Sequence, residues 1–483
     1  MKSTIAKDSL KLTGSKVVMM MISMITAMLL SRYRTLEEYG TYSQLLMVIN
    51  LTISLFVLGL PNSSNYFLAR TDIKSERQRF LSVFFSLSNA LSLLIGVVLL
   101  LLAPKIVNYF NNPLIEDFVF VLAIYPWNRI ILSTIDQILI IYHKMDKLIV
   151  FRVVNSIFLL LLIVVVKLMN WSFFVYMALF VAGESVFTLV ALYIVKGLEK
   201  RLTLDFDKKT IIEILKFSIP LGLATAVGTF HIEFDKLFIS VLLSTEEVAL
   251  YTNASREMPV SIIVTSITAV LMPKLVRMLN KNKHDDAVHL WGESITLAYS
   301  IIAVIVSGLI VYAPEAITLL YSKKYIGGTN IFRIYSLILL FKCTYFGIIL
   351  NSIGKTKQIF YSSLLALLTN IILNYVLFLS IGFIGPAVST LITTALVATF
   401  QLFLTSKILN IKLKNVFPWK SIFIISLINI GYGIVFHFIK NWIELEKLVG
   451  NEIESLILGV IWVTIYFISI LSYIKTKWNS LDV

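Results

Sequence analysis

Long apolar runs, most of them 20 or more residues in length, occupy nearly the whole chain. About 20 helical residues cross a hydrocarbon layer of about 30 Å, whereas membrane strands need only roughly ten residues with alternating polarity. The chain is 58% hydrophobic and 14% charged, which is too apolar for a soluble protein of this length. Because the pattern fits helices and not strands, the sequence predicts an all-α polytopic membrane protein.

The apolar runs predict fourteen transmembrane helices. They cover residues 12–31, 41–60, 80–103, 117–141, 148–169, 172–195, 217–242, 255–273, 291–313, 329–350, 358–380, 386–406, 419–439 and 453–474. With the N-terminus placed inside, 29 Lys and Arg fall in inner segments and nine in outer segments. This bias predicts that both termini are cytoplasmic.

Three short sequence echoes recur at a spacing of about 210 residues. They pair 103–110 with 313–321, 37–42 with 246–251, and 147–151 with 357–361. A shift of six helices preserves orientation, so the pattern predicts two parallel six-helix repeats that form two lobes. We expect an N-terminal lobe at 1–210, a C-terminal lobe at 211–415, and the extra transmembrane helices 13 and 14 within 416–483.

Charged side chains inside the predicted spans are the candidates for function, because each costs roughly 2.5–3.5 kcal/mol at the centre of a membrane helix. Arg129 lies near the middle of span four, and Lys342 lies in the middle of span ten. The other candidates for a substrate cavity are Lys236, Arg333 and His231. The acidic candidates for ion coupling are Asp136, Glu184 and Asp235. Together these residues predict a polar, net-basic cavity.

Structural interpretations of the same charges stay open. Lys236 and Arg333 lie within reach of the outer interface, where a long side chain can extend to water. Lys236 also stands three residues after a glutamate, the spacing of an ion pair within one helix. Arg129 stands two turns before Asp136 on one helix face, and it can equally neutralise Asp136 or Glu184 as a packing bridge.

No motif in the sequence predicts a catalytic centre, a cofactor or a metal site. Residues 284–289 carry two His and two Asp beside a Lys-rich inner loop, and we interpret them as a solvated segment. The sequence has no phosphate-binding Gly-rich loop and no large outer loop with paired carboxylates. We therefore expect a transport protein, not an enzyme, and no nucleic-acid partner.

Three local patterns carry a family resemblance. Residues 247–254 read Glu-Val-Ala-Leu-Tyr-Thr-Asn-Ala, 351–355 read Asn-Ser-Ile-Gly-Lys, and Asn370 and Asn374 precede Gly-Phe-Ile-Gly-Pro-Ala at 382–387. With the fourteen spans, they resemble the polysaccharide transporter branch of the multidrug/oligosaccharidyl-lipid/polysaccharide (MOP) exporter superfamily. The nearest resemblance is to Wzx-type flippases of O-antigen and capsule repeat units. Ala249 and Pro386 depart from the family's usual Gly and Ala.

The resemblance implies a flippase of the bacterial inner (cytoplasmic) membrane. Such a protein moves an undecaprenyl-diphosphate-linked oligosaccharide to the outer leaflet by alternating access, through a cationic cavity between two lobes. The implied partners are that lipid-linked oligosaccharide, the bilayer, and polysaccharide polymerase or chain-length machinery. No binding residue of a relative maps onto this sequence, so the site residues rest on the charge argument.

Two other functions stay open. A small-molecule antiporter of the multidrug-extrusion branch is disfavoured because that branch typically has twelve spans. A membrane oligosaccharide polymerase or ligase is disfavoured because the predicted outer loops are short.

Overall fold

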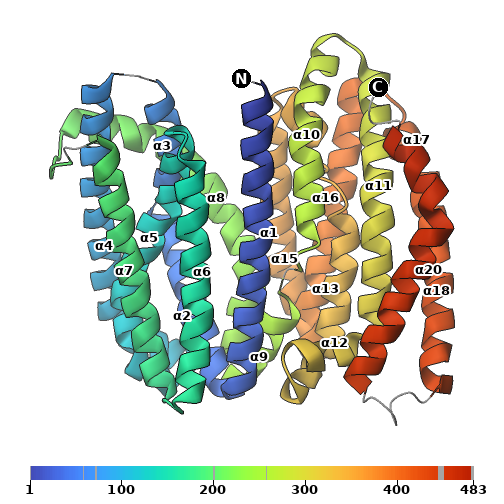
Figure 1. Ribbon diagram of the computed structural model, residues 1–483, viewed down its shortest axis with the longest axis horizontal. Coiled ribbons are helices and arrows are strands. Elements are labelled where there is room, and N and C mark those ends of the chain that lie inside the picture. The colour runs from blue at the N-terminus through green and yellow to red at the C-terminus, as the bar shows by residue number, and fades with distance from the viewer. Residues whose placement is uncertain are drawn as a thin grey trace. The chain divides into compact units, whose positions relative to one another are not determined.

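The computed structural model describes residues 2–57, 59–70, 73–199, 202–256, 258–443 and 451–479. Within these ranges the chain is helical and has no β-strand (Figure 1). Nine of the described helical segments are long and apolar enough to cross a membrane, or ten if one bent pair counts as a span. One of the nine, Thr356–Leu409, contains two successive helices. The all-α membrane fold is confirmed, and the count of fourteen spans stays a prediction.

Contacts divide the chain into two compact units, Met1–Ala249 (unit 1) and Leu250–Val483 (unit 2). Unit 1 contains α1 (Lys2–Tyr33), α2 (Leu36–Phe56), α3 (Leu60–Arg70), α4 (Lys74–Phe110), η1 (Pro113–Phe118), α5 (Val119–Ile141), α6 (Met145–Leu168), α7 (Phe173–Glu199), α8 (Lys208–Leu242) and the first half of α9 (Thr245–Ala254). Unit 2 contains α10 (Ser261–Asn280), α11 (His284–Val311), α12 (Ala313–Leu320), η2 (Lys323–Gly328), α13 (Thr329–Phe341), α14 (Ile348–Ser352), α15 (Thr356–Ile381), η3 (Gly382–Ile384), α16 (Gly385–Leu409), α17 (Leu413–Val416), α18 (Trp419–Ile443) and α20 (Asn451–Asn479).

The central helix of unit 1 is α5, which contacts α2, α3, α4, α6 and α7. Gly96 of α4 allows close approach, because a Cβ at this position would lie 2.3 Å from the Ala123 carbonyl oxygen. Around this centre, α1 packs on α6, and α2 packs on α8. The interior position of α5 explains why most of its side chains are buried.

Within unit 1, α8 packs against α2, α3 and α4, although it opens the second predicted repeat. The loop before α8 binds α4, since the Asp205 N–H donates to the Ser86 hydroxyl over 2.9 Å and Arg79 pairs with Asp207 over 2.9 Å. Hydrogen bonds from Thr210, and then the charge of Arg79, hold the pKa of Asp207 below its ordinary value. The compact units divide the chain after Ala249, whereas the predicted repeats divide it after residue 210. The lobes at 1–210 and 211–415 stay a prediction.

A bend of 50° separates Lys208–Pro220 from Thr225–Leu242 within α8. Pro220 has no backbone N–H to donate, and its ring crowds the preceding turn. The sequence therefore contains a physical cause for this bend.

In unit 2, α11 is the central helix and contacts α10, α13, α18 and α20. The extra helices α18 and α20 pack on it through an apolar cluster that includes Phe436 and Trp462, whose rings stack at 4.8 Å. A hydrogen bond also joins α20 to α11, since the Tyr466 hydroxyl donates to the Ser300 carbonyl over 2.8 Å. Ion pairs of Lys440 with Glu315 and of Lys477 with Glu293 join the same helices to the rest of the unit. The C-terminal helix pair is thus part of unit 2.

One of the sequence echoes marks equivalent helix starts. At the start of α2, the Glu38 N–H donates to the Thr35 hydroxyl, and the Thr35 N–H donates to the Glu38 carboxylate. At the start of α9, Ser244 and Glu247 make the same reciprocal pair of bonds. Both are capping boxes, which satisfy backbone donors that a helix start leaves unpaired. A short 3-10 helix also precedes both α5 and α13, so part of the element order occurs twice.

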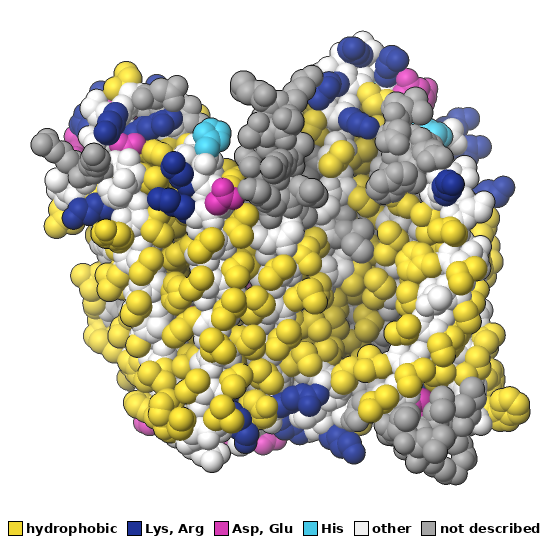
Figure 2. Space-filling model, viewed as in Figure 1, with side chains coloured by type: hydrophobic (Ala, Val, Ile, Leu, Met, Phe, Trp, Pro, Cys, Tyr) yellow, Lys and Arg dark blue, Asp and Glu magenta, His cyan; other side chains and the backbone are white. Residues whose placement is uncertain are grey.

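On the visible face of each unit, hydrophobic side chains form a broad band (Figure 2). Lys and Arg gather at the two ends of the band (Figure 2). Apolar surface between charged ends is the arrangement expected of helices that cross a bilayer.

Candidate functional site

A stripe of polar side chains runs along the face of α5 that its neighbours leave uncovered. Arg129 and Ser133 are exposed, while Asp136 and Gln137 are partly exposed. Their spacing of three to four residues puts them on one side of the helix. Residues 130–132, 134 and 135, which lie between them in sequence, are buried. The α5 stripe, defined as these four residues, is therefore an accessible polar face on a helix that is mostly apolar.

The neighbouring helix α6 presents a different surface. Its exposed residues between 150 and 166 are all apolar and are Val150, Val154, Ile157, Leu161 and Val165. Such a face suits lipid tails, whereas a guanidinium or a carboxylate is costly in hydrocarbon. The α5 stripe therefore suits contact with water or with a polar ligand.

Arg129 is the cation of the α5 stripe. Its guanidinium interacts electrostatically with the Tyr125 hydroxyl and with Glu184 of α7. Among the described residues Arg129 makes no ion pair. Because a guanidinium has five N–H donors in a planar fork, the exposed Arg129 side chain can bind an anionic ligand.

Two polar contacts tie α6 to its neighbours beside Arg129. The Arg152 Nε donates to Asp136 over 2.7 Å, and its Nη2 donates to the Leu132 carbonyl over 2.5 Å, which joins α6 to α5. The Asn155 amide donates to Glu184 over 2.8 Å, which joins α6 to α7. Asp136 and Glu184 thus each have a partner on another helix.

A third polar contact joins α5 directly to α7. The Asn128 side-chain amide donates to the Ser185 hydroxyl over 3.0 Å, and the Thr188 hydroxyl donates to Asn128 Oδ1 over 3.0 Å. In membranes, such interhelical hydrogen bonds add to helix association. Polar contacts therefore fix α5, α6 and α7 relative to one another around Arg129.

The partner of Asp136 differs from the sequence interpretation. Asp136 pairs with Arg152 of α6, whereas we had considered Arg129. Arg152 lies near the start of the predicted span 148–169 and was not among the candidates; in the structure it lies in the second turn of α6. A signal was present, because Asp136 and Arg152 lie 16 residues apart on either side of the short turn at 142–144. Facing positions of a helical hairpin have this kind of separation.

The candidates on α8 lie together on one stretch of helix. Lys236 pairs with Glu233 over 2.9 Å, and Glu233 also accepts from the Asn50 amide of α2 over 3.2 Å. Asp235 is buried, and His231 is partly buried with its Nδ1 unpaired among the described residues. The structural interpretation of Lys236, an ion pair within one helix, thus matches a contact of the structure. The functional roles of Lys236, Asp235 and His231 stay predictions.

Span ten is not one continuous helix, which corrects the expected position of Lys342. Helix α13 ends at Phe341, Lys342 is its C-cap, and the helix resumes only at Ile348. Lys342 is partly exposed at this break. The cation therefore stands at a helix end beside non-helical backbone, where sequence periodicity had placed it inside a helix.

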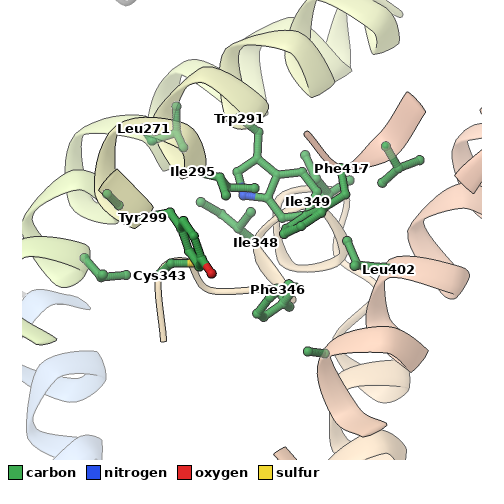
Figure 3. Packing of buried hydrophobic residues seen from close by; sticks show 14 of the residues in the cluster. Leu271, Trp291, Ile295, Tyr299, Cys343, Phe346, Ile348, Ile349, Leu402 and Phe417 are labelled. Carbon is green, nitrogen blue, oxygen red and sulfur yellow. The ribbon is translucent and has the colours of Figure 1, made fainter. Parts of the chain in front are cut away.

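The break in span ten is held by side chains of α11 and of the α16–α18 connection. The Trp291 indole donates to the Thr344 hydroxyl over 2.9 Å, and the Phe346 ring stacks on Phe417 at 5.9 Å. Cys343 is buried in the same apolar cluster (Figure 3). Irregular backbone at membrane depth is tolerated where protein buries it or where it borders a water-filled cavity. The break is thus a supported feature of unit 2.

Arg333 is tied to its own unit. Its Nε donates to the Ile310 carbonyl at the end of α11 over 3.2 Å, and its Nη1 donates to the Asn330 side chain over 3.2 Å. These bonds satisfy one of the carbonyls that a helix end leaves unpaired. The structure therefore gives Arg333 a structural contact and does not bring it to Lys342.

The two asparagines of the family pattern also have structural contacts. The Asn370 amide of α15 donates to the hydroxyls of Ser389 and Thr390 on α16, over 3.1 and 3.2 Å. The Asn374 amide donates to Asn370 over 3.5 Å. Because both asparagines are fully buried, this part of the pattern joins α15 to α16.

The fold is similar to solved structures of membrane transporters. A structure titled lipid II flippase MurJ, inward closed conformation, matches with a TM-score of 0.73 at 18% identity, over 96% of this chain and 100% of that chain. An inward-facing multidrug resistance MATE family transporter of the MOP superfamily matches with a TM-score of 0.66 at 14% identity, over 81% and 94%. The chain therefore has the fold of MOP superfamily transporters.

The chain belongs to the family described as polysaccharide biosynthesis protein, which matches residues 29–329, more than half of the sequence. The resemblance to the polysaccharide transporter branch is confirmed. A probable low-salt glycan biosynthesis flippase, Agl15 of Haloferax volcanii, is 20% identical over 43% of this chain and 44% of its own length. A probable multidrug resistance protein, NorM of Halalkalibacterium halodurans, is 27% identical over 44% and 51%. The chain spans about half the length of the curated relatives it matches.

Family and fold together show a multi-pass membrane protein of the polysaccharide biosynthesis family. By their titles, the solved structures that the fold resembles are flippases or transporters, and one curated relative is a probable flippase. The described residues contain no group of three or more His, Cys, Asp and Glu that can hold a metal ion.

Proposed function

We propose that this protein is a flippase for undecaprenyl-diphosphate-linked oligosaccharide repeat units. It moves each unit from the cytoplasmic to the outer leaflet of a bacterial cytoplasmic membrane, where the units enter a surface polysaccharide. The observation that carries the proposal is the α5 stripe, an accessible polar face with the exposed Arg129 guanidinium, beside the apolar exposed face of α6. Membership of the polysaccharide biosynthesis family supports the substrate class.

The head group of such a lipid sets the physical problem. Sugar hydroxyls and a diphosphate lose water in the bilayer interior, and each unpaired polar group costs kilocalories there. A polar surface at membrane depth replaces part of that water while the polyprenyl tail stays among the lipid tails. The α5 stripe offers such a surface, with one guanidinium, one carboxylate, one hydroxyl and one amide.

Arg129 is the proposed ligand of the diphosphate. A guanidinium binds two phosphate oxygens at once, and such charge-assisted bonds are about twice as strong as neutral ones. The polar contacts among α5, α6 and α7 fix the helix that carries Arg129. Little conformational entropy is therefore lost when the anion binds. In unit 2, Lys342 at the helix break is a separate candidate cation for phosphate oxygens.

The direction of transport follows from charge. With both termini cytoplasmic, as the distribution of Lys and Arg favours, the substrate leaves a negative interior. Each negative charge moved outward then gains about 2.3 kcal/mol per 100 mV. Ion antiport is a further proposed drive, for which buried Glu184 and Asp235, together with Asp136 and His231, are the titratable candidates.

The test is reconstitution into liposomes that contain a fluorescent undecaprenyl-diphosphate oligosaccharide, with appearance of the sugar on the opposite leaflet as the readout. The intact protein should accelerate transfer over empty liposomes, and Arg129→Gln should slow it while Lys196→Gln does not. Lys196 is an exposed cation at the end of α7 and so controls for general charge. Equal rates with and without protein would reject the proposal. Flux that ignores pH and sodium gradients would reject antiport alone.

A small-molecule exporter is the second candidate, favoured by the NorM relative and by the MATE fold match. Its cargo would be organic cations, for which the exposed Arg129 is a poor ligand. Efflux of an organic cation from the same liposomes, without transfer of the lipid-linked sugar, would favour this candidate. An enzyme of polymerisation would instead leave unpolymerised units on the outer face of cells that lack it.

A further inference from the structure

A cationic pocket lies in unit 1, and none of the residues that line it belongs to α5. It forms where the C-terminal ends of α1 and α6 meet the turn at 169–172, and its volume is about 180 Å³. That volume is far more than the roughly 15 Å³ that one water requires. The polar or aromatic residues that line it are Tyr33, Arg34, Lys167, Asn170, Trp171 and Tyr176.

The local backbone fixes the pocket wall. Asn170 adopts the left-handed conformation with φ of 53°, and the Trp171 N–H donates to the Val166 carbonyl over 3.0 Å. This is the usual closure of a helix C-terminus, and it sets where residues 167–171 stand. The Trp171 carbonyl then accepts from Arg34 Nη2 over 3.0 Å, while the Arg34 guanidinium lies 5.8 Å from the Phe173 ring centroid. The Arg34 side chain is thus held in place at the pocket.

Lys167 approaches the pocket from the other helix. Its ammonium lies 5.1 Å from the centre of the Tyr33 ring, and among the described residues it makes no ion pair. The pocket lining contains two cations and no Asp or Glu. An anion inside this pocket would be attracted to both side chains.

The surroundings of the pocket favour a lipid as the source of that anion. The adjacent exposed side chains of α6 are Leu161, Val165 and Leu168, which belong to an apolar face. Trp171 and Tyr33, both more than two-fifths exposed, are residue types that concentrate where a membrane meets water. A ligand with an anionic head and an apolar tail therefore matches both the pocket and the adjoining face.

We propose that this pocket binds the phosphate group of an anionic membrane lipid. Arg34 and Lys167 contact the phosphate oxygens, Asn170 and Tyr176 border the head group, and an acyl or prenyl chain lies along the exposed face of α6. The site is separate from the transport surface on α5 and does not depend on the identity of the transported sugar.

Native mass spectrometry of the delipidated full chain tests this proposal. The protein is titrated with palmitoyl-oleoyl phosphatidylglycerol and, in parallel, with the phosphatidylcholine of the same chains. We expect tighter binding of phosphatidylglycerol, weakened about tenfold by Lys167→Gln and further by Arg34→Gln with Lys167→Gln, because one charge-assisted contact is worth about a factor of ten. Phosphatidylcholine binding should not change.

Lys105→Gln is the matched control, since Lys105 is an exposed cation beside a mainly apolar pocket near the end of α4. An equal loss in Lys105→Gln, or no loss in Lys167→Gln, would overturn the proposal. Inorganic phosphate forms the other arm, and displacement of phosphatidylglycerol by micromolar phosphate would show a free-anion site and overturn the lipid assignment. If the double variant does not fold, Lys167→Glu alone decides, and retained phosphatidylglycerol binding by that variant overturns the proposal.

Discussion

Helix α5 of unit 1 and the α13–α14 segment of unit 2 both follow a short 3-10 helix, yet they present their cations differently. Helix α5 runs unbroken over 23 residues despite Pro126, and Arg129 projects from its side. The unit 2 segment breaks without any proline, and Lys342 stands at the break. Packing therefore decides helix continuity here more than the presence of proline does.

The physical reason lies in what surrounds each helix. Other helices cover α5 on most sides, and polar contacts from α6 and α7 fix its register. In unit 2, residues 343–347 read Cys-Thr-Tyr-Phe-Gly, which are weak helix formers, and Cys343 and Phe346 instead fill an apolar cluster. The proposed cation of unit 1, Arg129, therefore projects from a continuous helix, whereas the proposed cation of unit 2, Lys342, stands beside backbone that is not helical.

The largest expected effect is that of Arg129→Ala. Loss of a bidentate partner for the diphosphate should lower the rate of sugar transfer about a hundredfold, as expected for about 3 kcal/mol. The measurement is transfer in liposomes at equal protein content, with surface glycan in cells as a second readout. Arg129→Lys should restore part of the rate. A rate within twofold of the unmodified protein would mean that the α5 stripe does not bind the substrate during transfer.

The second effect, that of Lys342→Ala, should be about tenfold, because an ammonium binds phosphate as a single point charge. The same transfer assay measures it, and Lys342→Arg should retain most of the rate. If Lys342→Ala lowers the transfer rate more than Arg129→Ala does, Lys342 contributes more to transport than Arg129, contrary to the proposal. If it has no effect, the helix break does not contact the substrate.

Hydropathy was sufficient to predict an all-α membrane fold because a run of 20 apolar residues has few alternatives to a helix. The echo at 37–42 and 246–251 marks two real capping boxes, since such a box is encoded by residues three positions apart. The break at Lys342 was not predictable in this way. It depends on Trp291 and Phe417, which are distant in sequence from the residues they support.

The candidate site was predicted in part for the same reason. A charge within an apolar run is visible in sequence, so Arg129 and Glu184 stood out. Partners were less visible, because Arg152 stands near the end of a predicted span, where a charge is common, and Asn155 carries no charge. Exposure distinguishes Arg129 from the buried Glu184, and exposure depends on tertiary packing.

A third variant, Thr344→Val, tests the support of the helix break. It leaves the Trp291 indole without its acceptor, which should cost about 1–2 kcal/mol and lower the unfolding temperature by a few degrees. Ser133→Ala is the control on α5, because the Ser133 hydroxyl bonds only within its own helix. Equal unfolding temperatures for the two variants would mean that the Trp291–Thr344 hydrogen bond does not stabilise the helix break.

The smallest expected effect is that of Asp136→Asn. The Asp136 side chain is 40% exposed, and an ion pair with such exposure contributes less than about 1 kcal/mol. Arg152 keeps its bond to the Leu132 carbonyl, so α6 should stay in register with α5. Chemical denaturation in detergent measures the change. A loss of several kcal/mol would show that this pair, and not helix packing, holds α5 in place.

Aqueous accessibility of the α5 stripe tests the central claim most directly. The chain has one cysteine, the buried Cys343, so a Cys343→Ala background accepts single cysteines for labelling. A charged, membrane-impermeant thiol reagent should modify the Ser133→Cys variant rapidly and leave the Ile157→Cys variant on α6 unmodified. If both variants are equally unreactive, the α5 stripe does not face water, and the proposed transport surface is contradicted.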